Sequence, residues 1–332
     1  MREPAFWWRK RSLSAALLAP VAACYGAVAA RRMARDGARA GVPVICVGNY
    51  TLGGAGKTPT AILLAKLLVQ GGETPFILSR GYGGSVSAAK RVDVQADRAA
   101  EVGDEALLLA RAAPTIVSPD RVAGAALAQQ QGASVIVMDD GLQNASLKKD
   151  FTIAVVDAQR GLGNERVFPA GPLRAPLAPQ LAATDALLVV GDGDGAAEVV
   201  QAARRRGLPV WHGKLVPEAS SLADLRRSTV LAFAGIGDPD KFFASAEEVG
   251  LVVAERAGFP DHHRFTAQEA AELIARAERA GLALVTTEKD RARMMGDPAL
   301  DALAARVRVL PVTIAVSEVD ELRILLRQRI GR

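Results

Sequence analysis

Residues 44–60, which read V-I-C-V-G-N-Y-T-L-G-G-A-G-K-T-P-T, constrain the fold more than any other part of the chain. An apolar, β-branched run at 42–47 is followed by the glycine-rich turn 48–56. Lys57 and Thr58 then open a segment in which leucine and isoleucine recur with helical spacing. A strand, a glycine turn, Lys-Thr and a helix, in that order, are the context of a phosphate-binding P-loop.

The turn has the residue types that a bound phosphate requires. Its glycines allow backbone N–H groups to point at phosphate oxygens, and the helix N-terminus adds a positive dipole end. Lys57 would reach the β- and γ-phosphates, and the Thr58 hydroxyl would bind Mg²⁺. Thr51 replaces the first glycine of the generic pattern, so an ordinary strand-to-helix turn is the alternative. The predicted nucleotide-binding residues are Thr51, Gly53, Gly54, Ala55, Gly56, Lys57, Thr58 and Pro59.

Strand-like and helical patterns alternate along the chain after this segment. The strand-like runs of the first half are 42–47, 75–78, 115–117, 135–138, 152–156 and 187–190. Helical patterns separate the earlier of these runs, at 58–70, 101–113 and 120–130. The alternation predicts an α/β fold with a P-loop-type parallel sheet flanked by helices.

A second series of strands and helices begins near residue 228 and includes a strand-like run at 307–315. It predicts a second, smaller α/β domain. We therefore expect a membrane-associated helix at 1–40, a P-loop domain at 41–212, a linker at 213–227 and the smaller domain at 228–332.

Polar residues follow two of the predicted strands at their carboxyl ends, where parallel sheets bind ligands. Asp139 and Asp140 come directly after the run 135–138, and Arg80 follows the run 75–78. An acidic residue at a strand end downstream of a P-loop holds Mg²⁺ directly or through water. Two adjacent carboxylates also repel each other unless a cation is near. A polar strand end that merely leads into a turn is the alternative.

Other candidates have weaker support from the residues alone. Asp104 and Glu105 stand at an expected helix start, where acidic residues often only complement the helix dipole. Arg174 lies in a Pro/Gly-framed loop and could bind an anion or be solvated. His262 is one of three histidines, and proton transfer and a structural role are both open to it.

The first 40 residues differ from the rest of the chain. Trp7 and Trp8 adjoin basic residues, residues 13–30 are uncharged, and arginines follow. A helix over 13–30 would be about 27 Å long, the lower limit for crossing a bilayer core. Its hydrophobicity is modest, and the flanking tryptophans and cations suit the headgroup layer. We expect a surface helix or shallow anchor; a signal peptide and a buried helix are the alternatives.

Composition narrows the partners. The net charge of +5 favours an anionic partner, such as a phosphorylated substrate or an acidic membrane surface. No aromatic-basic motif or zinc finger supports a nucleic-acid partner, so none is expected. Two cysteines make neither a disulfide framework nor a metal cluster, which fits a reducing compartment.

A set of motifs in one order resembles the tetraacyldisaccharide 4′-kinase family of lipid A biosynthesis over nearly the whole chain. The first four are G-N-x-T-x-G-G-x-G-K-T-P at 48–59, S-R-G-Y-G at 79–83, V-G-D-E at 102–105 and D-D-G-L-Q at 139–143. The others are P-A-G-P-L-R at 169–174, A-F-A-G-I-G at 232–237, F-P-D-H-H at 259–263 and T-T-E-K-D at 286–290. The family pattern includes Thr51, but it usually has histidine where this chain has Asn144.

The resemblance implies an ATP- and Mg²⁺-dependent kinase on the cytoplasmic face of the bacterial inner membrane, attached peripherally to the lipid surface. Its acceptor is the 4′-hydroxyl of an acylated glucosamine disaccharide 1-phosphate. The implied catalytic residues are Lys57, Asp104 as the base and His262 as its orienting partner. Because His262 belongs to the smaller domain, the resemblance implies that this domain contributes to the active-site cleft. The implied metal residues are Thr58, Asp139 and Asp140. The implied substrate residues are Arg80, Glu105, Gln143, Asn144 and Arg174.

Two other functions remain open from the sequence. A membrane-recruited P-loop ATPase or GTPase switch would share the glycine turn. Such switches of one class place a lysine before the turn, where this chain has Leu52, and GTPases usually carry an N-K-x-D motif that is absent here. A kinase for another small molecule is the second alternative, and the oligomeric state is left open.

Overall fold

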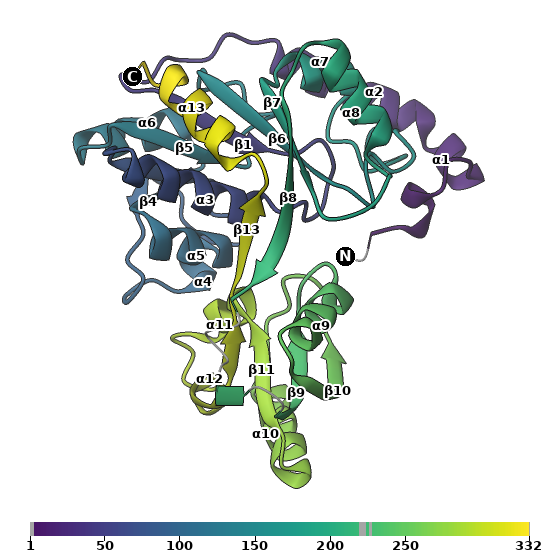
Figure 1. Ribbon diagram of the computed structural model, residues 1–332, viewed down its shortest axis with the longest axis vertical. Coiled ribbons are helices and arrows are strands. Elements are labelled where there is room, and N and C mark those ends of the chain that lie inside the picture. Colours follow the sequence, from purple (N-terminus) through teal and green to yellow (C-terminus); the bar gives the residue numbers. More distant parts are fainter. Residues whose placement is uncertain (1–2, 219–223, 226–227, 332) are drawn as a thin grey trace.

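The computed structural model describes residues 3–218, 224–225 and 228–331, and its strands form two sheets (Figure 1). In spatial order the larger sheet has β13 (Val312–Val316), β8 (Val210–Pro217), β7 (Ala186–Val190), β6 (Phe151–Asp157), β1 (Val44–Gly48), β5 (Val135–Asp139), β2 (Pro75–Ser79), β4 (Thr115–Val117) and β3 (Lys90–Arg91). The smaller sheet has β10 (Val252–Gly258), β9 (Thr229–Ala234), β11 (Ala283–Thr287) and β12 (Arg308–Leu310).

The helices connect these strands in chain order. In the first half they are the 3₁₀ turn η1 (Ala5–Trp8), α1 (Leu13–Leu17), α2 (Ala19–Met33), α3 (Lys57–Gln70), α4 (Ala99–Val102), α5 (Asp104–Ala112) and α6 (Arg121–Gln130). In the second half they are α7 (Leu177–Ala182), α8 (Ala197–Arg205), α9 (Pro239–Glu248), α10 (Ala267–Ala280), α11 (Glu288–Met294), α12 (Asp301–Arg306) and α13 (Val319–Arg329).

The predicted α/β fold with a parallel sheet is confirmed. All pairs in the smaller sheet are parallel, and the larger sheet departs from this only at its edges, where β13–β8 and β3–β4 are antiparallel. β1 lies centrally between β5 and β6, with Val47 paired to Asp139. The P-loop and the acidic strand end therefore emerge side by side at one edge of the sheet.

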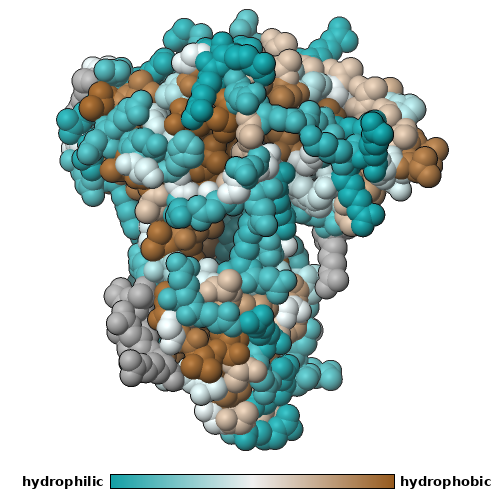
Figure 2. All heavy atoms as spheres, turned by 45° about the vertical axis from the view of Figure 1, so that its right-hand side comes forward, coloured by the Kyte–Doolittle hydropathy of each residue, from teal (hydrophilic) through white to brown (hydrophobic). Residues whose placement is uncertain are grey.

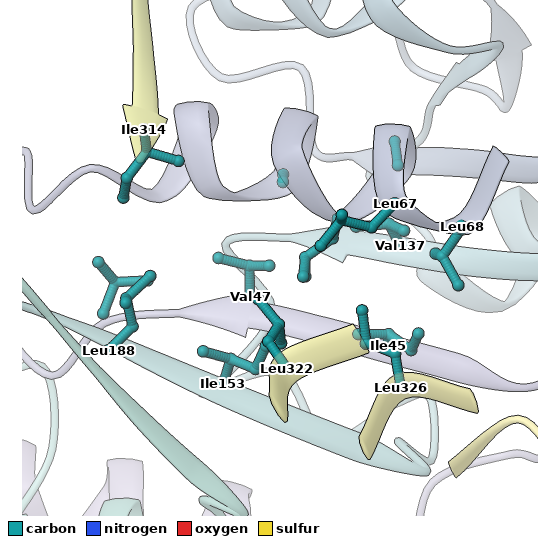
Figure 3. Close-up of a cluster of buried hydrophobic side chains, with 14 of the residues drawn as sticks. Ile45, Val47, Leu67, Leu68, Val137, Ile153, Leu188, Ile314, Leu322 and Leu326 are labelled. Atoms are coloured by element: carbon teal, nitrogen blue, oxygen red, sulfur yellow. The ribbon is translucent and has the colours of Figure 1, made fainter. Parts of the chain in front are cut away.

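The core of the larger sheet lies between its central strands and the helices α3 and α13 (Figure 3). Ile45, Val47 and Ile153 point from the strands toward Leu322 and Leu326 of α13, and all five side chains are buried. Burying each such side chain contributes about 1.5–3 kcal/mol. This packing fixes the strand ends that carry the site.

The end of the chain differs from expectation. The run 307–315, predicted as one strand of the smaller domain, forms β12 and β13, which lie in different sheets. Pro311 stands between them, and because it has no N–H it interrupts the pairing. β13 pairs with β8, so residues 312–331 lie with the larger sheet.

The segment predicted as a linker also differs in part. Residues 213–217 belong to β8, which pairs with both β7 and β13. Residues 219–223 and 226–227 of the predicted linker lie outside the described residues. Figure 1 shows β8 and β13 extending from the larger upper part toward the smaller lower part.

Two predicted helices are each divided. The helix predicted at 101–113 breaks at Gly103, whose φ is 89°, and Asp104 becomes the first residue of α5. A side chain at Gly103 would collide with the carbonyl oxygen of Tyr82. The apolar N-terminal run forms α1 and α2, which meet before Pro20. Among the described residues, no helix has both the length and the apolar character needed to cross a bilayer.

Candidate active site

The P-loop connects β1 to α3 with two residues in the left-handed region. Gly53 has φ 99°, and Gly56, the N-cap of α3, has φ 93°. Only glycine adopts these values at little cost. Asn49 Nδ2 and Lys57 Nζ both donate to the carbonyl oxygen of Gly53, over 3.2 and 3.4 Å, and so hold the loop against the helix start.

Asp139 and Asp140 lie next to the P-loop, as the strand register requires. Asp140 is an aspartate with φ 51°, a strained conformation typical of functional sites. Its Oδ1 is 3.8 Å from Lys57 Nζ, and its Oδ2 accepts from Arg174 Nη1 over 3.0 Å. Arg174 Nε also donates to the carbonyl oxygen of Thr51 over 2.9 Å. The structure thus brings four predicted site residues together: Thr51, Lys57, Asp140 and Arg174.

The carboxylates at this strand end fit a magnesium ion. Within the described residues, Oδ1 of Asp139 and Oδ1 of Asp140 are buried and have no hydrogen-bond partner. Thr58, at the start of α3, is buried beside the same loop. No group of three or more His, Cys, Asp or Glu side chains that could hold a metal occurs in the described part of the chain. Mg²⁺ in phosphate sites commonly takes only one or two carboxylates, with waters and phosphate oxygens completing its coordination.

Burial shifts two pKa values in this group. Burial of Asp139, together with the negative charges of Glu105 and Asp140, raises its pKa to about 7. Burial likewise lowers the pKa of Lys57, although Asp140 opposes the shift. A cation beside Asp139 and an anion beside Lys57 would each favour the charged form that burial disfavours.

A second cluster joins the two sheets where α5 and α11 are in contact. Asp104, the first residue of α5, is buried, and His262 lies in the loop that follows β10. His262 Nδ1 is 3.4 Å from Asp104 Oδ2. His262 has φ 55°, so it is another strained non-glycine residue. The predicted pair is therefore in contact across the two sheets.

The surroundings favour the ionised form of both members. Burial opposes ionisation of Asp104, but His262, Arg293 and Lys289 together outweigh it and hold its pKa well below the usual range. The hydrogen bond with Asp104 raises the pKa of His262, against the opposing effect of burial.

Glu105 links this cluster to the P-loop. Lys289 Nζ of α11 donates to Glu105 Oε1 over 2.6 Å, and the charge of Lys289 lowers the pKa of Glu105. The charge of Glu105 in turn acts on the pKa of both Lys57 and Asp139. The two groups of site residues are thus close enough to interact electrostatically.

The remaining predicted substrate residues are placed differently. Gln143 donates to the carbonyl oxygen of Asn49 and to Gln180 Oε1, both over 2.7 Å, so its amide is engaged within the protein. Asn144 Oδ1 accepts from the backbone N–H and hydroxyl of Ser146 and shapes the turn. Arg80 is exposed at the strand end of β2.

Three charged residues of the site were not predicted. Arg121, at the start of α6, is buried and donates to the carbonyl oxygen of Asp139 over 3.5 Å. Its place after the strand 115–117 could have revealed it by the strand-end rule. Lys289 lies within a motif of the family resemblance but had no predicted role. Arg293 had no signal, because the helix α11 was not expected.

The fold and these residues define a P-loop nucleotide-binding α/β protein whose polar site is shared between two sheets. The family model that matches the chain, over residues 14–331, is described as tetraacyldisaccharide-1-P 4′-kinase. The chain belongs to this family, as the motif set predicted. The expected 4′-kinase activity in lipid A biosynthesis is thereby confirmed.

Individual relatives agree with this assignment. A tetraacyldisaccharide 4′-kinase of Methylobacterium sp. is 57% identical, with all of both chains covered. One of Afipia carboxidovorans is 54% identical over 100% of this chain and 98% of its own. A crystal structure of LpxK from Aquifex aeolicus in complex with ATP has a TM-score of 0.73 and 26% identity, covering 95% of this chain and 99% of that one.

Proposed function

We propose that this chain transfers the γ-phosphate of ATP to the 4′-hydroxyl of tetraacyldisaccharide 1-phosphate, in a site formed by both sheets. The observation that carries the proposal is the proximity of two groups with different tasks. Lys57 and Asp140 belong to a phosphate-binding loop, and Asp104 and His262 form a carboxylate–imidazole pair. Phosphoryl transfer needs this combination of charge neutralisation and positioning of the attacking hydroxyl.

On the phosphate side, the backbone N–H groups of 53–58 and the N-terminus of α3 would bind the phosphate oxygens. Lys57 would release its contact with Asp140 and neutralise charge on the β- and γ-phosphates. Arg174, which already contacts Asp140 and Thr51, would turn the same guanidinium toward a phosphate. Such charge-assisted contacts gain strength because the site is largely buried.

Asp139, Asp140 and Thr58 are the residues that would hold a magnesium ion. When bound, Mg²⁺ would neutralise charge on the β- and γ-phosphates. Among the described residues, Oδ1 of each aspartate is buried and has no hydrogen-bond partner, which supports this assignment.

On the acceptor side, Asp104 would accept the proton of the 4′-hydroxyl while His262 orients it. Asp104 Oδ1 accepts from the backbone N–H of Glu105 over 3.0 Å, and its second lone pair could accept a hydroxyl proton. Arg80 and Arg174 are proposed to contact anionic groups of the substrate, and Glu105 its hydroxyls. Gln143 and Asn144 would support the turn beside them.

The N-terminal helices are proposed to bring the enzyme to the cytoplasmic surface of the inner membrane. An acylated substrate leaves the bilayer at a cost of about 0.8 kcal/mol per CH₂, so the enzyme must reach it there. Figure 2 shows the molecule with the side that carries α1 and α2 turned forward, and hydrophobic residues reach its surface. Arginines flank these helices at both ends, as an anionic lipid surface requires.

The direct test is phosphate transfer from labelled ATP to purified tetraacyldisaccharide 1-phosphate, with Lys57→Ala beside the wild type. We expect the variant to lose at least about 10²-fold in turnover, because it lacks the phosphate clamp. Lys66→Ala, an exposed lysine of the same helix, is the matched control and should retain activity. ATP hydrolysis without acceptor phosphorylation, or an active Lys57→Ala variant, would contradict the proposal.

A further inference from the structure

Arg293 of α11 makes several polar contacts where α11 meets α5. Its Nε and Nη2 reach Asp104 Oδ2, at 2.7 and 2.5 Å. Its Nη1 donates to the carbonyl oxygen of Gly235 over 2.6 Å and to Asp290 Oδ1 over 2.8 Å. Its Nη2 is also 3.5 Å from His262 Nδ1. The side chain is only 5% exposed.

These contacts determine where Asp104 can point. A guanidinium is planar and rigid, so two of its nitrogens on one carboxylate oxygen fix that oxygen in direction as well as in distance. The other end of the same guanidinium is fixed by Asp290, which is fully buried and accepts from the backbone N–H of Gly235 and from the hydroxyl of Thr287. Arg293 therefore ties Asp104 on α5 to Asp290 and Gly235, which belong to the smaller part of the molecule.

The charge of Arg293 has a second effect. Asp104 is buried, and a buried carboxylate without a cation prefers its protonated form. The charged or titratable groups around Asp104 are His262 from the loop after β10, Arg293, Lys289 and Asp290 from α11, and Glu105 from its own helix. Asp261 lies beside His262. Arg293 is the permanently charged group in direct contact with Asp104. His262 Nδ1 is also 3.4 Å from Asp104 Oδ2, whereas Lys289 is bonded to Glu105.

We propose that Arg293 is a positioning residue that holds the carboxylate of Asp104 ionised and in one orientation beside His262. The inference rests on the proposed role of Asp104 as the base. Arg293 would not touch the substrate; it acts through Asp104, whose Oδ1 would then face the acceptor hydroxyl. The Arg293–Asp104 ion pair would thus form only when the two parts of the molecule are in contact, and only then would Asp104 be ionised and correctly oriented.

The test compares kcat and KM across pH for the wild type, Arg293→Gln, Arg293→Lys and Asp104→Asn. Arg293→Gln should lower kcat by about 10²-fold at neutral pH, since the base is no longer aligned. Removing the cation raises the pKa of Asp104, so the acidic limb of the pH profile should move to higher pH. Arg293→Lys keeps the charge without the fork, so its acidic limb should stay close to wild type while kcat is partly restored. KM for ATP should change little.

Arg291→Gln is the matched control, because Arg291 is on the same helix and its bonds go to Met295 and the carbonyl oxygen of Val307. It should behave as wild type. If Arg293→Gln does not fold, Arg293→Lys carries the test, and full kcat in that variant would overturn the inference. A folded Arg293→Gln variant with an unshifted acidic limb would overturn it as well. Wild-type activity in Asp104→Asn would instead contradict the proposed role of Asp104 as the base, on which this inference rests.

Discussion

Single aspartates in this protein differ in charge state because their surroundings differ. Asp139 is buried among other carboxylates, and its pKa rises to about 7. Asp104 is also buried, but His262, Arg293 and Lys289 hold its pKa well below the usual range. Burial alone would raise both values, so the neighbouring charges decide between them. The cations Lys57 and Arg121 oppose the rise in the pKa of Asp139 but do not outweigh it.

This difference predicts a pH-dependent stability change at Asp139. Its pKa is raised in the folded protein, so its ionisation weakens the fold as pH rises from about 4 to about 7. Asparagine cannot ionise. In metal-free buffer, Asp139→Asn should therefore melt several degrees above the wild type at pH 8, whereas the two should melt together at pH 4.

Thermal melting at both pH values checks this prediction, with Asp150→Asn as the control at a carboxylate that bonds the backbone of Val44. Mg²⁺ should narrow the difference at pH 8, because it offsets the charge of Asp139 in the wild type. Equal melting of the wild type and Asp139→Asn at pH 8 would mean that Asp139 is not held in a costly charged state.

Residues near the P-loop were the most predictable from the sequence. Glycine spacing and the strand-end rule led to Lys57, Asp139 and Asp140 without any fold in hand. The contacts of Arg293 were not predictable, because they depend on how α11 lies against α5. Gln143 was predicted from its motif as a substrate residue. In the structure its amide donates to two groups of the protein itself, which the motif could not indicate.

Helices α1 and α2 expose apolar side chains at intervals of three or four residues, which places them along one side of the helical segment. The exposed members are Leu13, Leu17, Val21, Tyr25 and Val28. Leu13 and Leu17 are 86% and 82% exposed. The preceding turn η1 is fixed to the larger part, because Trp7 Nε1 donates to the carbonyl oxygen of Pro169 over 3.0 Å. The apolar stripe is therefore held in a defined place on the molecule.

This stripe predicts how the protein reaches its lipid substrate. Leu13→Glu combined with Leu17→Glu should release the protein from vesicles that contain anionic lipid, because two charges would enter the acyl boundary. Use of the acylated substrate should weaken, while ATP binding stays unchanged. Vesicle flotation measures the first effect.

Ile324→Glu on α13 is the control, since Ile324 is 58% exposed on a different helix. It should float as the wild type does. Equal flotation of the stripe variant and the wild type would show that the lipid contact lies elsewhere.

At this scale the sequence indicated the helical patterns but not their ends. The uncharged run 13–30 predicted an N-terminal helix, which the structure divides at Leu18, shortly before Pro20. Gly103 divides the other long pattern because only glycine fits its φ against Tyr82. The prediction of one strand at 307–315 was wrong, because the chain passes from the smaller sheet to the larger one at Pro311.

The two parts of the molecule are connected twice, because the polypeptide leaves the larger sheet after β8 and returns to it at β13. β8 leads out, the smaller sheet is formed, and β13 and α13 come back to pack on the larger core. Such a return is invisible to local patterns, because a strand of either sheet has the same sequence character. The consequence is that both ends of the smaller part are anchored on the sheet that carries the P-loop.

Helix α13 should therefore contribute strongly to the stability of the larger part. Leu322 is buried in the core with Ile45 and Leu326. Leu322→Ala should lower the free energy of unfolding by about 2–5 kcal/mol, the usual effect of a buried leucine lost from a core. Denaturant unfolding measures it, and Ile324→Ala, on the exposed side of the same helix, should have little effect. If Leu322→Ala lowered the free energy of unfolding by less than Ile324→Ala does, the assignment of α13 to this core would be contradicted.

The central claim is that the two sheets share one reaction site through Asp104 and His262. A double-mutant cycle tests it most directly, with kcat measured for Asp104→Ala, His262→Ala and the double variant. A positioned base contributes about 10²–10⁴-fold to rate, and residues that act as a unit give losses that do not multiply. We expect the double variant to be little slower than the slower single variant, with KM for ATP unchanged. If the two reductions in kcat multiply fully in the double variant, the two residues act independently. The claim of one site shared through Asp104 and His262 would then be wrong.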